Sequence, residues 1–141
     1  MPVLVGWAAV TNSLEWAPVV LFVVIFLWTP PHFWALAIRH ADDYKAAGVP
    51  MMPVVVSLER TVRSMTVYAI LLTISTLVLI PVADLGWIYG VTSLVFGVAF
   101  VIGAVRLGSD PSPKRSMRLF TFSITYVTAI FVALTVDVLL R

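Results

Sequence analysis

The sequence lacks cysteine entirely and contains little charge. Of its 141 residues, 11% are charged and 61% are hydrophobic, whereas ordinary soluble domains carry roughly 25% charged residues. The absence of cysteine excludes disulfides and thiolate metal sites within the chain. The scarcity of charge, together with a mean hydropathy of +1.05, excludes an ordinary soluble domain and predicts an integral membrane protein surrounded by lipid.

The hydrophobic residues form runs that are long enough to cross a bilayer, which requires about 20 residues of helix. These runs are continuous and do not alternate with polar residues, so they favour helices over the strands of a barrel. We therefore predict an all-α fold, in which residues 1–141 form a single transmembrane bundle of about four helices. The expected spans cover residues 17–38, 62–83, 87–107 and 117–140.

All lysine and arginine residues except Arg141 lie in or next to two of the connectors between these runs. Arginines and lysines occupy the first and third connectors, whereas the second connector contains only Asp84. The positive-inside rule then places both basic connectors in the cytoplasm and the Asp84 turn and the C-terminus outside a plasma membrane. Trp16, Trp87 and Tyr89 are expected at the external interface. This topology explains the net charge of +2 without a nucleic-acid partner, and Lys114, Arg115 and Arg118 are interpreted as topology determinants.

The first span contains the sequence "TPPH" at residues 29–32. Two adjacent prolines remove backbone donors, so a kink is expected there. The kink is either a packing feature of the bundle or the wall of a cavity next to His32. An intramembrane histidine is often an interhelical hydrogen-bond partner, but ionisable groups within a membrane also mark functional sites. Both interpretations stay open on these residues alone.

If the helix continues through Asp43, then His32, Arg39 and Asp43 lie within about 20° of one line along it. The adjacent carboxylates of Asp42 and Asp43 suit either a solvated helix end or a Mg²⁺ ion that carries a phosphate. Arg39 and Lys45 would then bind the remaining phosphate charge. Residues 48–56 are expected to be extended because they contain two prolines.

Three features of the last span have simpler explanations. Ser123 and Tyr126 are expected to pack or to form hydrogen bonds between helices. Asp137 and Arg141 are four residues apart and are expected to form an ion pair.

Three segments carry a resemblance to a known family. "VGWAAVTNSL", "FLWTPPHFWALAIRHADDYKAAGVPMMPVV" and "LFTFSITYVTAIFVALTVD" resemble, in order and spacing, the protoheme IX farnesyltransferases or heme O synthases, which are UbiA-type intramembrane prenyltransferases. The resemblance implies transfer of a farnesyl group from farnesyl diphosphate to protoheme IX (heme b), with Mg²⁺ as cofactor. It also implies that this chain is the C-terminal portion of a fold of about nine helices.

The resemblance assigns roles to individual residues. It implies that Asp42 and Asp43 are catalytic residues that bind the metal, and that Arg39 and Lys45 contact the diphosphate. His32 and Trp34 belong to the heme synthase signature, with His32 on the porphyrin side. All of these residues lie in the long central segment.

One motif of the family is missing. The family's first acidic motif, an asparagine followed by aspartates at four-residue spacing, does not follow Asn12. We therefore expect the chain alone to be an inactive C-terminal half. It is a truncated gene product, the product of a mis-called start, or one half of a split enzyme whose partner is the N-terminal half. A non-enzymatic heme-binding membrane subunit and a transporter fragment are the alternative classes.

Overall fold

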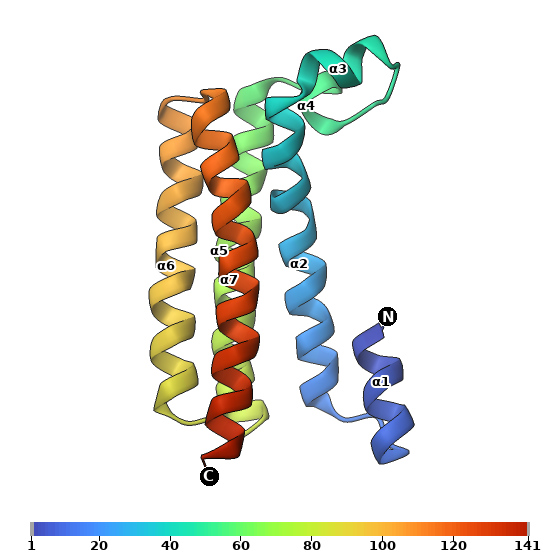
Figure 1. The fold of residues 1–141 in the computed structure, drawn as a ribbon, viewed down its shortest axis with the longest axis vertical. Helices are drawn as coiled ribbons and strands as arrows, with labels where there is room; N and C mark the ends of the chain where they lie inside the picture. The colour runs from blue at the N-terminus through green and yellow to red at the C-terminus, as the bar shows by residue number, and fades with distance from the viewer. Residues whose placement is uncertain (1, 141) are drawn as a thin grey trace.

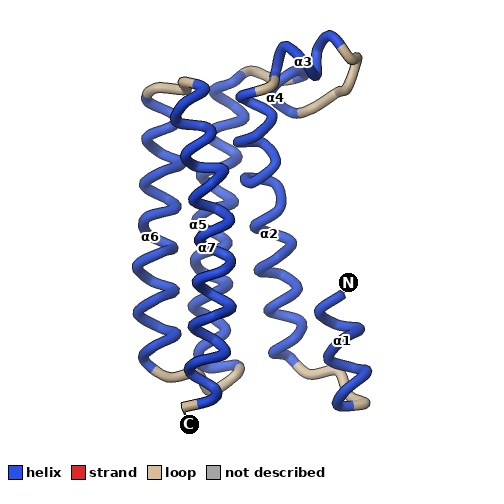
Figure 2. Tube along the Cα trace, in the orientation of Figure 1, coloured by secondary structure: helices blue, strands red, loops and turns tan. Residues whose placement is uncertain are grey.

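The computed structural model describes residues 2–140 and is helical almost throughout (Figure 1). Four helices are long and apolar enough to cross a membrane, which confirms the predicted all-α bundle. They are α2 (Trp16–Arg39), α5 (Leu58–Val82), α6 (Trp87–Ser109) and α7 (Pro113–Leu139). Three shorter helices are α1 (Pro2–Thr11), α3 (Ala41–Ala46) and α4 (Met52–Val55). The described residues contain no strand (Figure 2).

Two of the long helices begin before the apolar runs that predicted them. The hydroxyl oxygen of Ser57 accepts a hydrogen bond from the backbone N–H of Arg60, and that of Ser112 accepts one from the backbone N–H of Arg115. These N-caps satisfy backbone donors that a helix start leaves without partners. Each helix therefore gains a polar first turn, which a hydrophobicity criterion does not detect.

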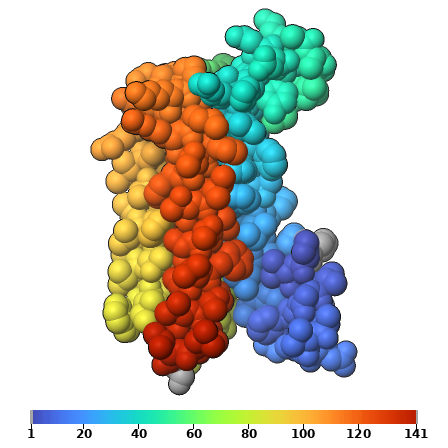
Figure 3. Space-filling view, viewed as in Figure 1, coloured from blue at the N-terminus to red at the C-terminus, as the bar shows by residue number. Residues whose placement is uncertain are grey.

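The long helices run alternately up and down, and each packs against two others. Helix α2 contacts α5 and α7, and α6 contacts the same two helices. Helix α1 lies beside the lower part of α2, and α3 projects from the opposite end (Figure 1). In the space-filling view, α3 stands clear of the bundle (Figure 3).

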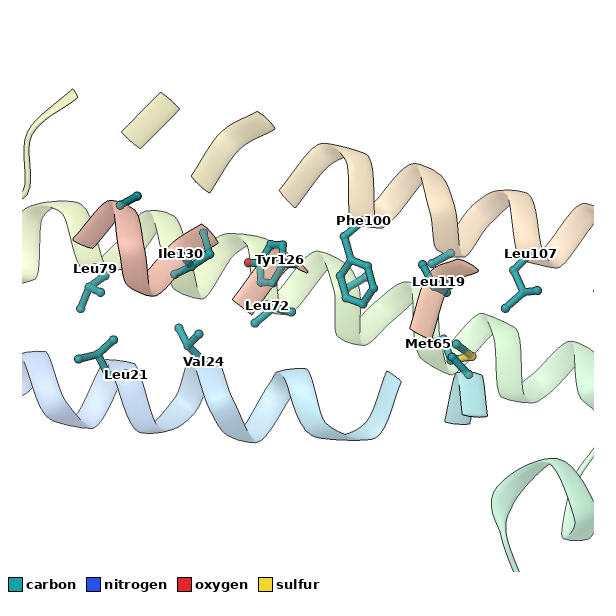
Figure 4. Close-up of a cluster of buried hydrophobic side chains, with 14 of the residues drawn as sticks. Leu21, Val24, Met65, Leu72, Leu79, Phe100, Leu107, Leu119, Tyr126 and Ile130 are labelled. Atoms are coloured by element: carbon teal, nitrogen blue, oxygen red, sulfur yellow. The ribbon is translucent and has the colours of Figure 1, made fainter. Parts of the chain in front are cut away.

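The core follows a seven-residue repeat. On α7 the buried positions are 116, 119, 123, 126, 130, 133 and 137, and the buried positions on α5 and α6 follow mostly steps of three and four residues as well. A repeat of about 3.5 residues keeps one face of each helix toward its neighbours in a left-handed bundle. Large side chains from all four helices meet along this seam, among them Val24, Leu72, Phe100 and Tyr126 (Figure 4).

Small residues on the seam allow the helices to approach closely. Gly97 on α6 is the clearest case, because a Cβ atom added there would lie 2.5 Å from Cγ2 of Thr73 on α5. Both fully buried tyrosines on the seam have hydrogen-bond partners: the Tyr89 hydroxyl donates to the carbonyl oxygen of Thr76 at 3.1 Å. The hydroxyls of Tyr126 and Thr76 are 3.3 Å apart, which confirms the expected interhelical role of Tyr126.

Tyr89 was expected at the membrane interface, and this prediction is wrong. Its side chain is fully buried between helices. Trp16 and Trp87, at the start of α2 and α6, are 76% and 78% exposed. The two tryptophans therefore mark one end of the bundle, as expected of amphipathic rings, whereas Tyr89 belongs to the core.

The start of α6 is capped by a side chain from α7. The Asp137 carboxylate accepts hydrogen bonds from the backbone N–H groups of Gly86 at 2.6 Å and Tyr89 at 3.3 Å. Asp137 is only 3% exposed. Arg141, its expected partner, lies outside the described residues, so that pair stays a prediction. The carboxylate joins the α5–α6 turn to the end of α7.

Candidate functional site

His32 lies in a stack of three rings between α2 and α7. The centroid of its ring is 4.4 Å from that of Trp28, with an interplanar angle of 20°. It is 4.5 Å from the ring centroid of Phe120, with an angle of 21°. Both prolines that precede His32 lie inside the continuous helix α2, so they do not end it. His32 is half-buried, and aromatic packing on both faces fixes the orientation of its imidazole.

Hydrogen bonds attach this stack to Ser123. Nδ1 of His32 is 2.6 Å from Oγ of Ser123, and Nε1 of Trp28 donates to the Ser123 carbonyl oxygen at 2.8 Å. The Ser123 hydroxyl in turn donates to the carbonyl oxygen of Phe120 at 2.6 Å. A hydroxyl has one hydrogen, so with the Ser123 hydroxyl donating to Phe120, Nδ1 of His32 is the donor to Ser123, and in the neutral imidazole Nε2 then carries the lone pair. The expected interhelical role of Ser123 is confirmed.

Trp34 does not join His32. Its ring meets that of Tyr68 on α5 edge to face, with centroids 5.4 Å apart. Two positions along a helix correspond to a rotation of about 200°, so the side chains of His32 and Trp34 leave α2 on opposite sides. Trp34 packs against the α2–α5 interface, and the structure does not bring these two signature residues together.

The predicted alignment required one helix through Asp43, and that condition fails: His32 and Arg39 share α2, but Asp43 does not. Helix α2 ends at Arg39, where His40 adopts a non-helical backbone (φ −108°, ψ 27°), and α3 begins at Ala41. The chain changes direction at His40 and carries Asp42, Asp43 and Lys45 onto α3. The predicted angle between Arg39 and Asp43 assumed an unbroken helix through residue 40, so it does not apply to the observed structure.

The carboxylates on α3 are open to solvent. Asp43 has 82% of its side chain exposed, and its Oδ2 lies 3.0 Å from Nδ1 of His40. Asp42 is also exposed, and Lys45 lies on the same short helix. Within residues 2–140, no group of three or more His, Cys, Asp or Glu side chains forms a metal site. Two adjacent carboxylates supply the oxygen ligands that Mg²⁺ prefers, but they fit it only as part of a larger set that includes substrate oxygens.

The connector after α3 is partly helical, contrary to the expectation of an extended segment at 48–56. Met52–Val55 form the short helix α4. Pro53 stands in its first turn, where no backbone N–H is required, so the proline favours this helix. Gly48 supplies the positive φ of 67° that ends α3 and reverses the chain.

A cationic groove lies between α2 and α7, at the end of the bundle from which α3 projects. It has a volume of about 810 Å³. Its basic lining residues are Arg39 from α2 and Lys114 and Arg118 from α7, and its other lining residues are Met117, Thr121, Phe122 and Thr125. The sequence interpretation treated Lys114 and Arg118 only as topology determinants. Their spacing of four residues, which places both on one face of a helix, was the available signal.

These features describe a polytopic helical membrane protein with an aromatic histidine site inside the bundle and cations and carboxylates at one end. Residues 1–134 match the model of the UbiA prenyltransferase family. The chain belongs to this family and is a multi-pass membrane protein. The resemblance seen in the sequence motifs is thereby confirmed.

Curated relatives cover almost the whole chain. It is 50% identical over 142 residues to a protoheme IX farnesyltransferase of Parafrankia sp. (strain EAN1pec), covering 99% of this chain and 45% of the relative. It is 49% identical to that of Frankia casuarinae (98% and 49%) and 48% identical to that of Gloeobacter violaceus (97% and 45%). The chain thus spans about half the length of the curated relatives it matches. No solved structure gives a significant match.

Proposed function

We propose that this chain supplies the C-terminal part of a protoheme IX farnesyltransferase, which transfers the farnesyl group of farnesyl diphosphate to protoheme IX and releases diphosphate and heme O. The observation that carries the proposal is that two chemically different sites lie seven residues apart on α2. His32 lies in an aromatic, half-buried site, and Arg39 lines a cationic groove at the end of the bundle from which α3, with its two carboxylates, projects. The relatives' names indicate the same reaction.

At the polar end, Asp42 and Asp43 would bind a divalent metal, which members of this family generally use to hold the diphosphate. We propose Mg²⁺, because carboxylate oxygens and a diphosphate suit this hard ion. When bound, it would neutralise charge on the leaving diphosphate. Arg39 and Lys45 would hold the remaining phosphate oxygens, and Lys114 in the same groove as Arg39 adds a further cation.

At the apolar end, His32 would lie on the porphyrin side. Its Nδ1 is engaged by Ser123, so Nε2 is the nitrogen available to a substrate. Trp34 would act through packing against Tyr68, by fixing the position of α2. The surrounding aromatic side chains would exclude water from a carbocation-like farnesyl centre.

The site would need further carboxylates from an N-terminal half, so we expect this chain alone to be inactive. The orientation proposed is that of the positive-inside rule: basic connectors in the cytoplasm, and the Asp84 turn and C-terminus outside the plasma membrane. The diphosphate would then be bound on the cytoplasmic side.

The proposal can be tested in membranes that contain the chain, farnesyl diphosphate and heme. Chromatography should show no heme O from the chain alone, and heme O when the N-terminal half of a relative is co-expressed. Asp43→Asn should abolish the restored activity and weaken Mg²⁺-dependent binding of farnesyl diphosphate. As a matched control, Asp110→Asn, in the other basic connector, should change neither. Heme O production by the chain alone, or equal activity of Asp43→Asn and the wild type, would contradict the proposal.

A further inference from the structure

A second basic groove lies between α6 and α7 and plays no part in the proposed reaction. Its volume is about 540 Å³. Arg106, Arg115 and Arg118 line it, together with Ala99, Ile102, Gly103, Leu119 and Phe122. The arginines lie near the end of α6 and the start of α7, which a short loop joins at the upper end of the bundle in Figure 1. The groove is therefore charged at one end and apolar along the rest of its length.

The arginines differ in how they are engaged by the protein. Nε of Arg115 is 3.2 Å from Oδ2 of Asp110, and its Nη1 donates to the carbonyl oxygen of Arg106 at 3.0 Å. Arg115 thus ties the α6–α7 loop to the last turn of α6. Arg106 and Arg118 form no ion pair within residues 2–140. The guanidinium groups of Arg106 and Arg118, from different helices, therefore line the same groove without an ion pair to a carboxylate of the described residues.

The groove extends from this charged end into the apolar part of the bundle. Arg106 and Ala99 are seven positions apart, which corresponds to about 10 Å along the helix. Ile102, between them, is 45% exposed. Gly103 brings the two helices close, because a Cβ atom there would lie 2.9 Å from Cδ1 of Leu119. The groove therefore has guanidinium groups at the end of the apolar helices and an apolar wall along them. In a membrane spanned by these helices, this order matches that of lipid headgroups and acyl chains.

We propose that this groove binds an anionic phospholipid, with its phosphate on Arg106 and Arg118 and an acyl chain along Ile102 and Phe122. Guanidinium groups form strong hydrogen bonds to phosphate oxygens. Basic pockets between transmembrane helices recognise anionic headgroups in this manner. Charge complementarity selects a lipid with net negative charge over a zwitterionic one, and the apolar wall selects a lipid over a free phosphate ion.

The proposal does not depend on the proposed reaction. Arg118 lines both grooves, whereas Arg106 lines only the α6–α7 groove. Arg106 is therefore the residue to vary. Arg60 provides a matched control, since it is an exposed arginine at the start of α5, at the same end of the bundle.

The test uses the full chain in phosphatidylcholine vesicles that contain phosphatidylglycerol. Electron spin resonance would compare the association of spin-labelled phosphatidylglycerol with that of spin-labelled phosphatidylcholine. The wild type should prefer phosphatidylglycerol, and Arg106→Gln should lower this preference roughly fivefold, the factor for one arginine near the surface. Arg60→Gln should leave it unchanged.

Two further variants distinguish the groove from general charge and from misfolding. Arg106→Lys keeps the charge and should keep most of the preference for phosphatidylglycerol. Ile102→Trp keeps all arginines but fills the apolar part of the groove, and it should lower this preference. Helix content by circular dichroism should be equal in all variants. Equal preferences in Arg106→Gln and Arg60→Gln would overturn the proposal. Displacement of the labelled lipid by millimolar inorganic phosphate would show a small-anion site and would overturn it as well.

Discussion

Nδ1 of His32 donates a hydrogen bond to the hydroxyl of Ser123, and this bond joins α2 to α7 over a distance of 2.6 Å. The two residues are 91 positions apart in the chain. The bond leaves the other imidazole nitrogen unengaged by Ser123, so the fully buried Ser123 selects the tautomer of His32.

Ser123→Ala should therefore leave Nδ1 without its acceptor. A half-buried donor that loses its partner costs about 1 to 3 kcal/mol of unfolding free energy, which titration with denaturing detergent in micelles would measure. Ser123→Thr keeps the hydroxyl and should recover part of the loss. Ser75→Ala is the control, because the Ser75 hydroxyl bonds only the Leu71 carbonyl of its own helix. An equal loss in both alanine variants would contradict this role for Ser123.

Replacing Asp137 should destabilise the junction of α5 and α6. Asp137→Ala removes the acceptor of two backbone N–H groups, and loss of an N-cap costs about 0.5 to 2 kcal/mol. Hydrogen exchange at the Gly86 and Tyr89 amides should become faster. In Glu59→Gln, where the altered side chain lies on the exposed first turn of α5, these amides should exchange as in the wild type.

Gly97→Ala should force α5 and α6 apart, since the new Cβ atom would meet Thr73. Overpacking of this kind costs about 1 to 3 kcal/mol. Thr73→Ala removes the atoms that clash, so the double variant should be more stable than the sum of the single effects predicts. Gly6→Ala is a matched control, because no atom lies within 4 Å of its added Cβ. Strict additivity in the Gly97 and Thr73 pair would exclude direct contact.

Lys114 offers a test of the α2–α7 groove in an enzyme completed by an N-terminal half. Lys114→Gln should raise KM for farnesyl diphosphate several-fold and leave KM for heme unchanged, because only the phosphate end would lose a cation. Arg63→Gln, at the start of α5 and outside this groove, should change neither value. A rise in both KM values for Lys114→Gln would point to a structural effect instead.

The sequence predicted the helices well because lipid imposes simple requirements on backbone and hydrophobicity. It did not show which face of each helix is buried, because apolar residues occur all around the helices. Only small residues such as Gly97 and Ser123 distinguish the buried positions. Tyr89 was misplaced for the same reason: a tyrosine near a helix start suits both an interface and a core. Only the Thr76 carbonyl, 13 residues away in the chain, decides between them.

The site was predicted less completely, and the reasons are local. The family resemblance identified His32, Arg39 and Asp43 as candidate site residues. A single non-helical residue, His40, ends α2, so Asp43 does not lie on the same helix as the other two. Lys114 was overlooked because basic residues near a membrane boundary have a topological explanation that is sufficient by itself. Its position opposite Arg39 depends on how α2 and α7 pack, which no local pattern specifies.

The contact between Asp137 and the start of α6 also bears on the order of events during synthesis. The Gly86 amide emerges from the ribosome 51 residues before the carboxylate that binds it. Until α7 has crossed the membrane, the α5–α6 hairpin would keep these amides at the bilayer surface, where water can satisfy them. The α5–α6 turn would then reach its final structure only after α7 has inserted, because Asp137 near the end of α7 supplies the acceptor for these amides.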